Sequence, residues 1–261
     1  MAMSNLPPAL ELRGVDMHYG YVRALDAIDI HVNQGEVLGL VGDNGAGKSS
    51  LLKVMSGAHQ PTRGTILVHG TETVFHSPSD STAAGIQMVY QDLALVDPQD
   101  VATNLHIGRE IRRWGPLGWL GFIDHKAQRK RSEAELEALG VRTAAVTRPV
   151  EMLSGGQRQV VALARGATRV AGDRNGVLLL DEPTAALGYE QTQQVQALIR
   201  RMAGQGIACV LVTHNLPQAM DISDRVVVLN RGRIVADVVP AATDHDQLVG
   251  WITGARPSMF S

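Results

Sequence analysis

The stretch EVLGLVGDNGAGKSSLLKVMS, residues 36–56, decides the fold. Its first part, Glu36 to Val41, is almost wholly apolar, which is typical of a strand in a sheet that is covered on both faces. A glycine-rich loop follows at once, and we expect a helix over Lys48 to Ser56. A buried strand, a glycine loop and a helix in this order predict the first unit of a parallel α/β sheet.

The loop between these two elements fits the pattern G-x-x-x-x-G-K-[ST]. It consists of Gly42, Asp43, Asn44, Gly45, Ala46, Gly47, Lys48 and Ser49, and Ser50 follows in the helix. Glycines let the backbone wrap around phosphate oxygens, so that N–H groups and the helix N-terminus face the anion. Lys48 would reach the β and γ phosphates, and the Ser49 hydroxyl would bind Mg²⁺. A chance glycine-rich turn is the alternative, whereas a dinucleotide fingerprint fails because Ser50 stands in place of its third glycine.

The remaining pattern predicts strands and helices around this unit. Alternation from Ala9 to Val32 predicts short antiparallel strands with turns near Gly14 and Gly20. Further strands are expected at 61–70, 85–90, 177–180, 207–213 and 225–229, with a helix at 190–202. From 92 to 170 the strand pattern fades, and 126–139 has helical spacing, so we expect a helical insertion. Its basic triplet at 129–131 is short and followed by acids, which favours a solvated helix face over a nucleic-acid patch.

Composition and charge exclude several classes of protein. Of 261 residues, 44% are hydrophobic and 19% charged, enough apolar material for a large core. The net charge of -2 gives no global positive field for nucleic acid or an anionic membrane. The one cysteine, Cys209, lies in an apolar run, as a core residue in a reducing compartment would. Without a signal peptide or an apolar run near ~18 residues, we expect a soluble, cytoplasmic chain that reaches a membrane through a partner.

A second apolar strand ends in two acids. The run 177–180 leads into Asp181 and Glu182, which places both at the carboxyl edge of the sheet, where open α/β folds bind ligands. Asp181 would hold Mg²⁺ through water, and Glu182 would be the base for an attacking water. A solvated acidic strand end is the alternative, and it would be preferred if the phosphate loop were absent.

The segment LSGGQ, residues 153–157, precedes a helical run. Ser154 and Gln157 have the spacing of a capping box, so the segment could simply start a helix. Together with the phosphate loop and Asp181-Glu182 in this order, however, it resembles the signature of the ATP-binding cassette (ABC) ATPases. In that family Ser154, Gly155, Gly156 and Gln157 would contact ATP held by a second copy of the chain.

The resemblance covers nearly the whole chain and implies roles for further residues. Gln91, in VYQD, is similar to the glutamine that meets Mg²⁺ and the attacking water, and His214 to the histidine that contacts the γ-phosphate. A solvated glutamine and a structural histidine are the alternatives. Tyr19 is placed like the aromatic residue that stacks on adenine, although Tyr21 is nearby and either could be ordinary packing.

The resemblance also implies the fold and its division. We expect an α/β, RecA-like phosphate-loop NTPase core with a parallel sheet, an N-terminal antiparallel β subdomain and an inserted α-helical subdomain. The expected parts are 9–91 with 171–239 as the core, 92–170 as the helical subdomain carrying the signature, and 240–261 as a tail. Gly188 departs from the family, because a carboxylate that helps to connect the two ATP sites of a dimer is usual there.

Several stretches resemble the cassettes of bacterial sugar importers of the ribose, xylose and fructose type. These are VYQDLALVD, NLHIGRE and LVGWITGA. The resemblance implies an ATPase that uses ATP and Mg²⁺, pairs with a second copy and drives a separate membrane permease from the cytoplasmic face, with a sugar-binding protein outside. Alternatives are a cassette for another solute, such as branched-chain amino acids, or a soluble ABC ATPase that acts on DNA or ribosomes. Glu182 disfavours a regulator without turnover.

Overall fold

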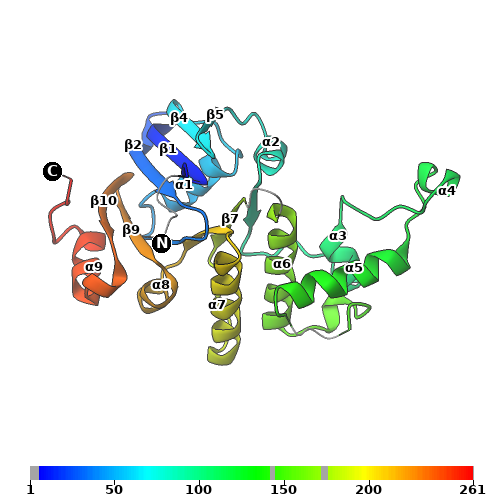
Figure 1. Ribbon diagram of the computed structural model, residues 1–261. Coiled ribbons are helices and arrows are strands. Elements are labelled where there is room, and N and C mark those ends of the chain that lie inside the picture. Colours follow the sequence, from blue (N-terminus) through cyan, green and yellow to red (C-terminus); the bar gives the residue numbers. More distant parts are fainter. Residues whose placement is uncertain (1–5, 142–144, 172–175, 261) are drawn as a thin grey trace.

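The computed structural model describes residues 6–141, 145–171 and 176–260, and its centre is a six-stranded sheet (Figure 1). The strands lie in the order β10-β9-β3-β8-β7-β6. Their bounds are β3 (Val37–Gly42), β6 (Ile86–Val89), β7 (Val177–Asp181), β8 (Ala208–Val212), β9 (Arg225–Asn230) and β10 (Arg233–Val238). Neighbours are parallel except for the antiparallel pair β9 and β10. The predicted parallel α/β sheet is therefore confirmed.

The central strands are buried on both faces, and alternate residues enter different cores. Val177 and Leu179 join the core that contains α1 (Lys48–Met55), while Leu178 and Leu180 join the core that contains α6 (Gly155–Val170) and α7 (Tyr189–Gly204). This period of two explains why the strands read as continuous apolar runs. Cys209 of β8 is fully buried, as predicted, and burial raises the pKa of its thiol to about 12.

A second, four-stranded sheet covers α1 and has the order β2-β1-β4-β5. Its strands are β1 (Leu10–Tyr19), β2 (Val22–Val32), β4 (Arg63–Val68) and β5 (Thr71–Thr73), all antiparallel. The prediction of a turn near Gly20 is confirmed, but the one near Gly14 is wrong. Gly14 lies within β1 at a register shift, where its N–H donates to Asp29 Oδ1 at 2.8 Å. A glycine in a bulge gives the same sequence signal as one in a turn.

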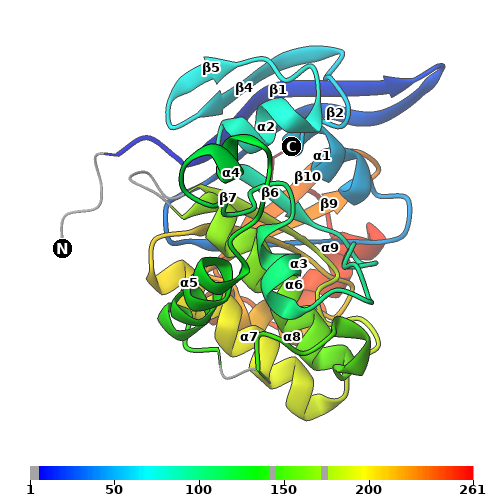
Figure 2. The same ribbon diagram turned by 90° about the vertical axis from the view of Figure 1, so that its right-hand side faces the viewer.

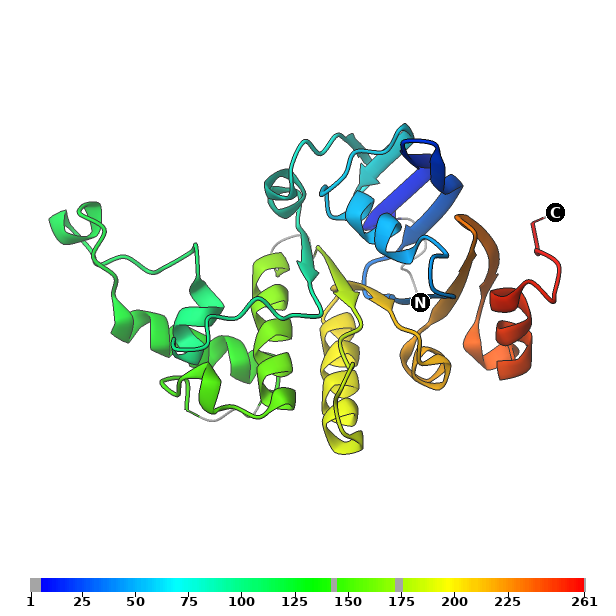
Figure 3. The same cartoon turned by 180° about the vertical axis from the view of Figure 1, so that it is seen from behind.

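The chain between β6 and β7 is largely helical and projects to one side of the sheets (Figures 1 and 3). Its elements are α3 (Val101–His106), α4 (Pro116–Trp119), α5 (His125–Ala138), a 3-10 turn (Val150–Met152) and α6. Their buried apolar residues share the core of α7 rather than forming one of their own. Seen from this side, the antiparallel sheet lies across the top of the molecule (Figure 2).

Elements that the sequence pattern did not indicate complete the fold. They are α2 (Pro78–Ala83), α8 (Leu216–Ile222), a 3-10 turn (Pro240–Ala242) and α9 (His245–Thr253). The last helix, which lies within the expected C-terminal tail 240–261, buries Leu248 and Trp251 against β9 and β10. Among the described residues, no helix is long and apolar enough to cross a membrane.

Candidate active site

The phosphate loop joins the end of β3 to the start of α1 and is packed tightly from outside. A Cβ on Gly42 would meet the Leu229 carbonyl oxygen at 2.3 Å, and one on Gly47 would meet the Ala24 carbonyl oxygen at 2.7 Å. Gly45 and Gly47 have φ of 79° and 109°, values that other residues rarely adopt. Packing from outside the loop therefore requires glycine at 42 and 47, and the backbone conformation favours it at 45.

The ammonium of Lys48 lies across this loop. Its Nζ donates to the carbonyl oxygens of Gly42 at 2.7 Å and Asp43 at 2.8 Å. Burial lowers the pKa of Lys48, and the carboxylates of Glu182, Asp43 and Asp181 oppose this shift. Since an ammonium carries three N–H groups, one remains for an anion within the loop.

The N-terminus of α1 adds backbone donors at the same place. Gly47 caps this helix without any side-chain hydrogen bond, and the first N–H groups of a helix have no partner inside it. The loop behind them is held by two hydrogen bonds to Asp43, from the N–H of Asn44 at 2.7 Å and that of Ala46 at 3.1 Å. Free donors, positive charge and a closed glycine loop fit the phosphate chain of a nucleotide.

Oxygen atoms that could bind Mg²⁺ lie at the start of α1 and at the end of β7. Ser49 is exposed on the first turn of α1, and Asp181 ends β7 half-buried. Burial and the charge of Glu182 raise the pKa of Asp181, against the influence of Lys48. Within the described residues the Asp181 carboxylate has no hydrogen-bond partner, so its lone pairs are open to a cation or its water. A hydroxyl with a carboxylate is a donor set that suits Mg²⁺.

Glu182 and His214 meet although they come from different strands. The Glu182 N–H donates to the Val212 carbonyl oxygen at 3.0 Å, which ties the end of β7 to the end of β8. Its carboxylate oxygen Oε2 then lies 2.7 Å from His214 Nδ1. Glu182 has a φ of 48°, an unfavourable backbone for this residue type, so the surrounding structure holds the carboxylate in place. His214 itself is 70% exposed.

A buried amide supports this corner, and the sequence interpretation missed it. Gln218 Oε1 accepts from the hydroxyls of Thr184 at 2.8 Å and Thr213 at 3.3 Å. It thus links the loops that follow Glu182 and precede His214. The spacing N-x-x-Q at 215–218 was a possible signal, because Asn215 caps α8 by accepting from the Gln218 N–H.

Gln91, Tyr19 and Tyr21 form no hydrogen bond to the other candidate site residues among the described residues. Gln91 is exposed just after β6, the strand next to β7. The Tyr19 ring packs edge-on against His59, with 5.6 Å between centroids, whereas Tyr21 is fully exposed at the turn after β1. Their roles toward Mg²⁺ and adenine stay predictions.

The signature segment starts α6, as its capping-box spacing predicts. Ser154 N–H donates to Gln157 Oε1 at 3.0 Å, and Gln157 N–H donates to Ser154 Oγ at 3.3 Å. Ser154, Gly155 and Gln157 are exposed. Gly156 is buried against α7, where a Cβ would meet Gln191 at 2.8 Å. The capping role is therefore confirmed, and contact with ATP stays a prediction.

Gly188 caps α7. Gln191 Oε1 accepts from the Gly188 N–H at 3.4 Å, but glycine has no side chain to return a bond to the helix. A Cβ built here meets nothing within 4 Å. The preceding Leu187 lies beside Gly155, so this loop adjoins the signature.

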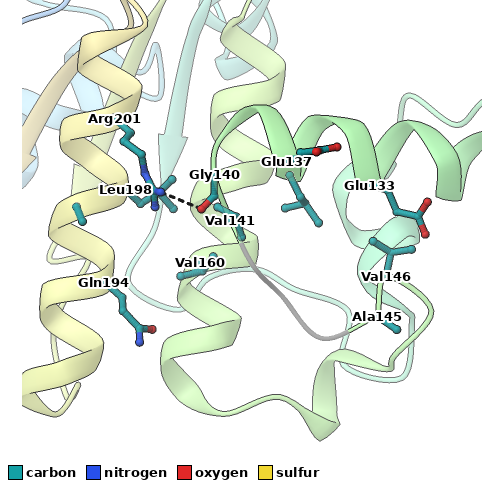
Figure 4. Close-up of a pocket in the computed structure, with 12 residues that line it drawn as sticks. Glu133, Glu137, Gly140, Val141, Ala145, Val146, Val160, Gln194, Leu198 and Arg201 are labelled. Carbon is teal, nitrogen blue, oxygen red and sulfur yellow. Dashed lines mark hydrogen bonds between the residues drawn. The ribbon is translucent and has the colours of Figure 1, made fainter.

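The structure thus brings Lys48, Asp181, Glu182 and His214 together and leaves the signature apart. A hollow of about 1020 Å³ lies elsewhere, between α5, α6 and α7 (Figure 4). Arg201 closes one end of it by donating to the Gly140 carbonyl oxygen at 2.8 Å. It contains no residue of the phosphate loop, so size alone does not mark the site.

Comparison with known proteins identifies a family profile and relatives of similar length. A family profile described as ABC transporter matches residues 25–185. The fructose import ATP-binding protein FrcA of Rhizobium meliloti is 41% identical over 251 residues, 95% of each chain. The xylose/arabinose import ATP-binding protein XylG of Sulfolobus acidocaldarius is 39% identical over 251 residues, which are 96% of this chain and 95% of XylG.

Longer relatives and solved structures match as well. The ribose import ATP-binding protein RbsA 1 of Rubrobacter xylanophilus is 37% identical over 247 residues, which are 95% of this chain but 47% of RbsA 1. The dimeric structure of MJ0796, a bacterial ABC transporter cassette, superposes with a TM-score of 0.70 at 23% identity, covering 88% of this chain and 98% of that one. The last comparison concerns the fold alone.

Proposed function

The chain belongs to the ABC transporter family, and on this premise we propose that it is the ATP-hydrolysing subunit that powers sugar import through a separate membrane permease. The observation that carries the proposal is the meeting of Lys48, Asp181, Glu182 and His214 at the carboxyl edge of one parallel sheet. This edge is where open α/β folds bind their ligands. Names of similar proteins, which are sugar import subunits, support the class of solute.

Each residue has a task that its position fits. Lys48 and the N–H groups of the phosphate loop bind the β and γ phosphates of ATP. Ser49, Asp181 and Gln91 would hold Mg²⁺, which would neutralise charge that develops on the phosphates. Glu182 orients and polarises the attacking water, and His214 keeps that carboxylate in line while facing the γ-phosphate side.

A second copy of the chain completes the site. Among the described residues, the side-chain hydrogen bonds of Ser154 and Gln157 stay within the signature and reach no residue of the phosphate loop, and most signature residues are exposed. In the proposed homodimer they contact the ATP that the partner holds, with both helix N-termini facing the phosphates. A dimeric cassette of similar fold supports this arrangement.

Membership of this family also leads us to propose partners for the chain and its location in the cell. We propose docking of the helical segment 92–170 on permease subunits at the cytoplasmic face of the cell membrane, with an extracytoplasmic sugar-binding protein delivering the solute. The division into 9–91 with 171–239, 92–170 and 240–261 is part of this proposal. FrcA and XylG, which the chain matches almost from end to end, support a single cassette that pairs with itself.

The test is reconstitution with membrane partners. The chain is co-expressed with a candidate permease, purified with it into proteoliposomes and assayed for phosphate release with fructose, xylose, ribose or arabinose and the matching binding protein. We expect hydrolysis to rise with one sugar. A rise with a branched-chain amino acid system instead would overturn the solute class, and a rise with DNA or ribosomes alone would overturn transport.

A further inference from the structure

The segment Ile111 to Asp124, here called the aromatic arm, exposes large apolar side chains that have no role in the proposed hydrolysis. Trp114 is 99% exposed and Trp119 is 89% exposed. Leu120 and Phe122 are exposed beside them. The whole chain contains three tryptophans, and two of them lie on this one segment. Such a concentrated exposed patch is typical of an interaction surface.

The aromatic arm is a folded hairpin and not a loose loop. Arg112 and Ile123 form an antiparallel bridge. Arg113 N–H donates to the Phe122 carbonyl oxygen at 2.9 Å, and Asp124 N–H donates to the Ile111 carbonyl oxygen at 2.7 Å.

The helix α4 forms its tip. Gly118 of this helix packs so closely on the neck that a Cβ would meet the Arg113 carbonyl oxygen at 1.7 Å. The tip is thereby fixed, and the tryptophans face outward from it. Figures 1 and 3 both show α4 as the part farthest from the two sheets.

Positive charge surrounds the neck of the aromatic arm. Residues 109–131 contain seven Lys or Arg and two Asp or Glu, although the whole chain has a net charge of -2. A hollow of about 530 Å³ at the neck is lined by four cations, Arg113, Lys126, Arg129 and Lys130, and by two acids, Asp124 and Glu133, beside His125. Among the described residues, Arg113, Lys126 and Lys130 form no ion pair. The net charge of the chain, which is an average over all residues, does not reveal this local excess of positive charge.

We propose that the aromatic arm touches the anionic lipid surface beside the permease, while the rest of the helical segment 92–170 docks on the permease subunits. Tryptophan with its amphipathic ring favours the interface between water and lipid, and neighbouring cations are attracted by anionic headgroups. Leu120 favours lipid over nucleic acid, because it has no ring on which a base could stack. The position of the aromatic arm beside a permease rests on the proposed function. Binding of the arm to lipid does not, and it can be tested without nucleotide.

The experiment uses the full chain and vesicles of defined lipid, without ATP. Vesicles of phosphatidylglycerol mixed with phosphatidylcholine should sediment the chain and shift its tryptophan emission to the blue. Pure phosphatidylcholine should do neither. The third tryptophan, Trp251, is 5% exposed and keeps its emission in both cases. Replacing Trp114 and Trp119 with Ser should abolish the shift and most of the sedimentation.

Charge is tested with a matched pair of variants. The double variant Arg113→Ala, Lys130→Ala should weaken vesicle binding by about 25-fold, since each cation near an anionic surface contributes about fivefold. The control Lys53→Ala, Arg63→Ala removes the same charge from exposed positions elsewhere and should bind normally. Equal binding of both variants, equal binding to neutral vesicles, or capture of the aromatic arm by detergent-solubilised permease without added lipid would overturn the proposal. Unchanged phosphate release by the variants shows that folding and hydrolysis are intact, so failure of lipid binding leaves the proposed function standing.

Discussion

The phosphate loop and the signature loop both place glycines at the start of a helix, yet their donors are in opposite states. Gly47 caps α1 with no side chain, so the first N–H groups of that helix stay open. At α6 the side chains of Ser154 and Gln157 bond back to the backbone and close the helix end. One loop is built to receive a ligand within its own chain. The other is complete as a helix start, and its contact with ATP held by a partner belongs to the proposed function.

The largest effect on ATP turnover should come from Glu182, which lies outside both the phosphate loop and the signature loop. Replacing Glu182 with Gln keeps the size and the contact with His214 but removes the charge that polarises water. Turnover should fall about 10²–10⁴-fold while ATP still binds. Phosphate release and a titration with fluorescent nucleotide measure the two quantities. Glu190→Gln, an exposed acid on α7, is the matched control, and unchanged hydrolysis by Glu182→Gln would refute the assignment.

Next in size is a change inside the phosphate loop. Replacing Lys48 with Ala removes a charged donor from the phosphates and two bonds that hold the loop. Nucleotide affinity of the single chain should drop about 10- to 100-fold. Equilibrium titration measures it, with Lys53→Ala on the same helix as control. Normal affinity of Lys48→Ala would show that the open donors of α1 suffice or that the loop binds something else.

A smaller effect separates the two roles of the signature loop. Ser154→Asn keeps a good helix cap, whereas Ser154→Ala loses about 1 kcal/mol of stability, or about 3 °C in Tm. If Ser154 also contacts the partner's ATP, Asn should lower turnover about tenfold with Tm unchanged. Thermal unfolding and phosphate release are compared on the same samples. Wild-type turnover with Asn would leave the capping box as the whole explanation of this loop.

The smallest effect is expected at Gly188, the neighbour of the signature. Gly188→Asp places a preferred capping residue at the start of α7 with free space around it, which should stabilise the chain by a few tenths of a kcal/mol, or about 1 °C in Tm. A restored carboxylate should also raise the Hill coefficient for ATP. Gly188→Asn caps equally well without the charge. A rise in Tm with no change in cooperativity for Asp would separate the cap from any link between sites.

Much of the fold follows from the sequence because its strongest signals are local. The phosphate loop, the apolar strands and the capping spacing at 154–157 each depend on neighbouring residues alone. Gly14 misled because bulges and turns need the same backbone freedom. The helix α9 escaped notice because Leu248 and Trp251 are buried by distant strands. Such tertiary burial leaves a weak trace in a short segment.

The site shows the same limit. Motifs supplied Lys48, Asp181 and Glu182 directly, but the contact between Glu182 and His214 needs two strand ends to lie side by side. Gln218 was missed because its amide acts between two loops that are far apart in sequence. The aromatic arm was missed because net charge averages over the chain. A single sequence does not show which residues that are distant along the chain lie close together in space.

The left-handed backbone of Glu182 affects which substitutions at this position would stabilise the fold during evolution. Gly, Asn and Asp tolerate a φ of 48° better than Glu does, so random substitution toward them would relax the backbone. Selection on folding alone therefore pushes against Glu here. A lineage that no longer needs turnover should lose this glutamate early and keep its glycines at 42 and 47, which the packing of the loop demands.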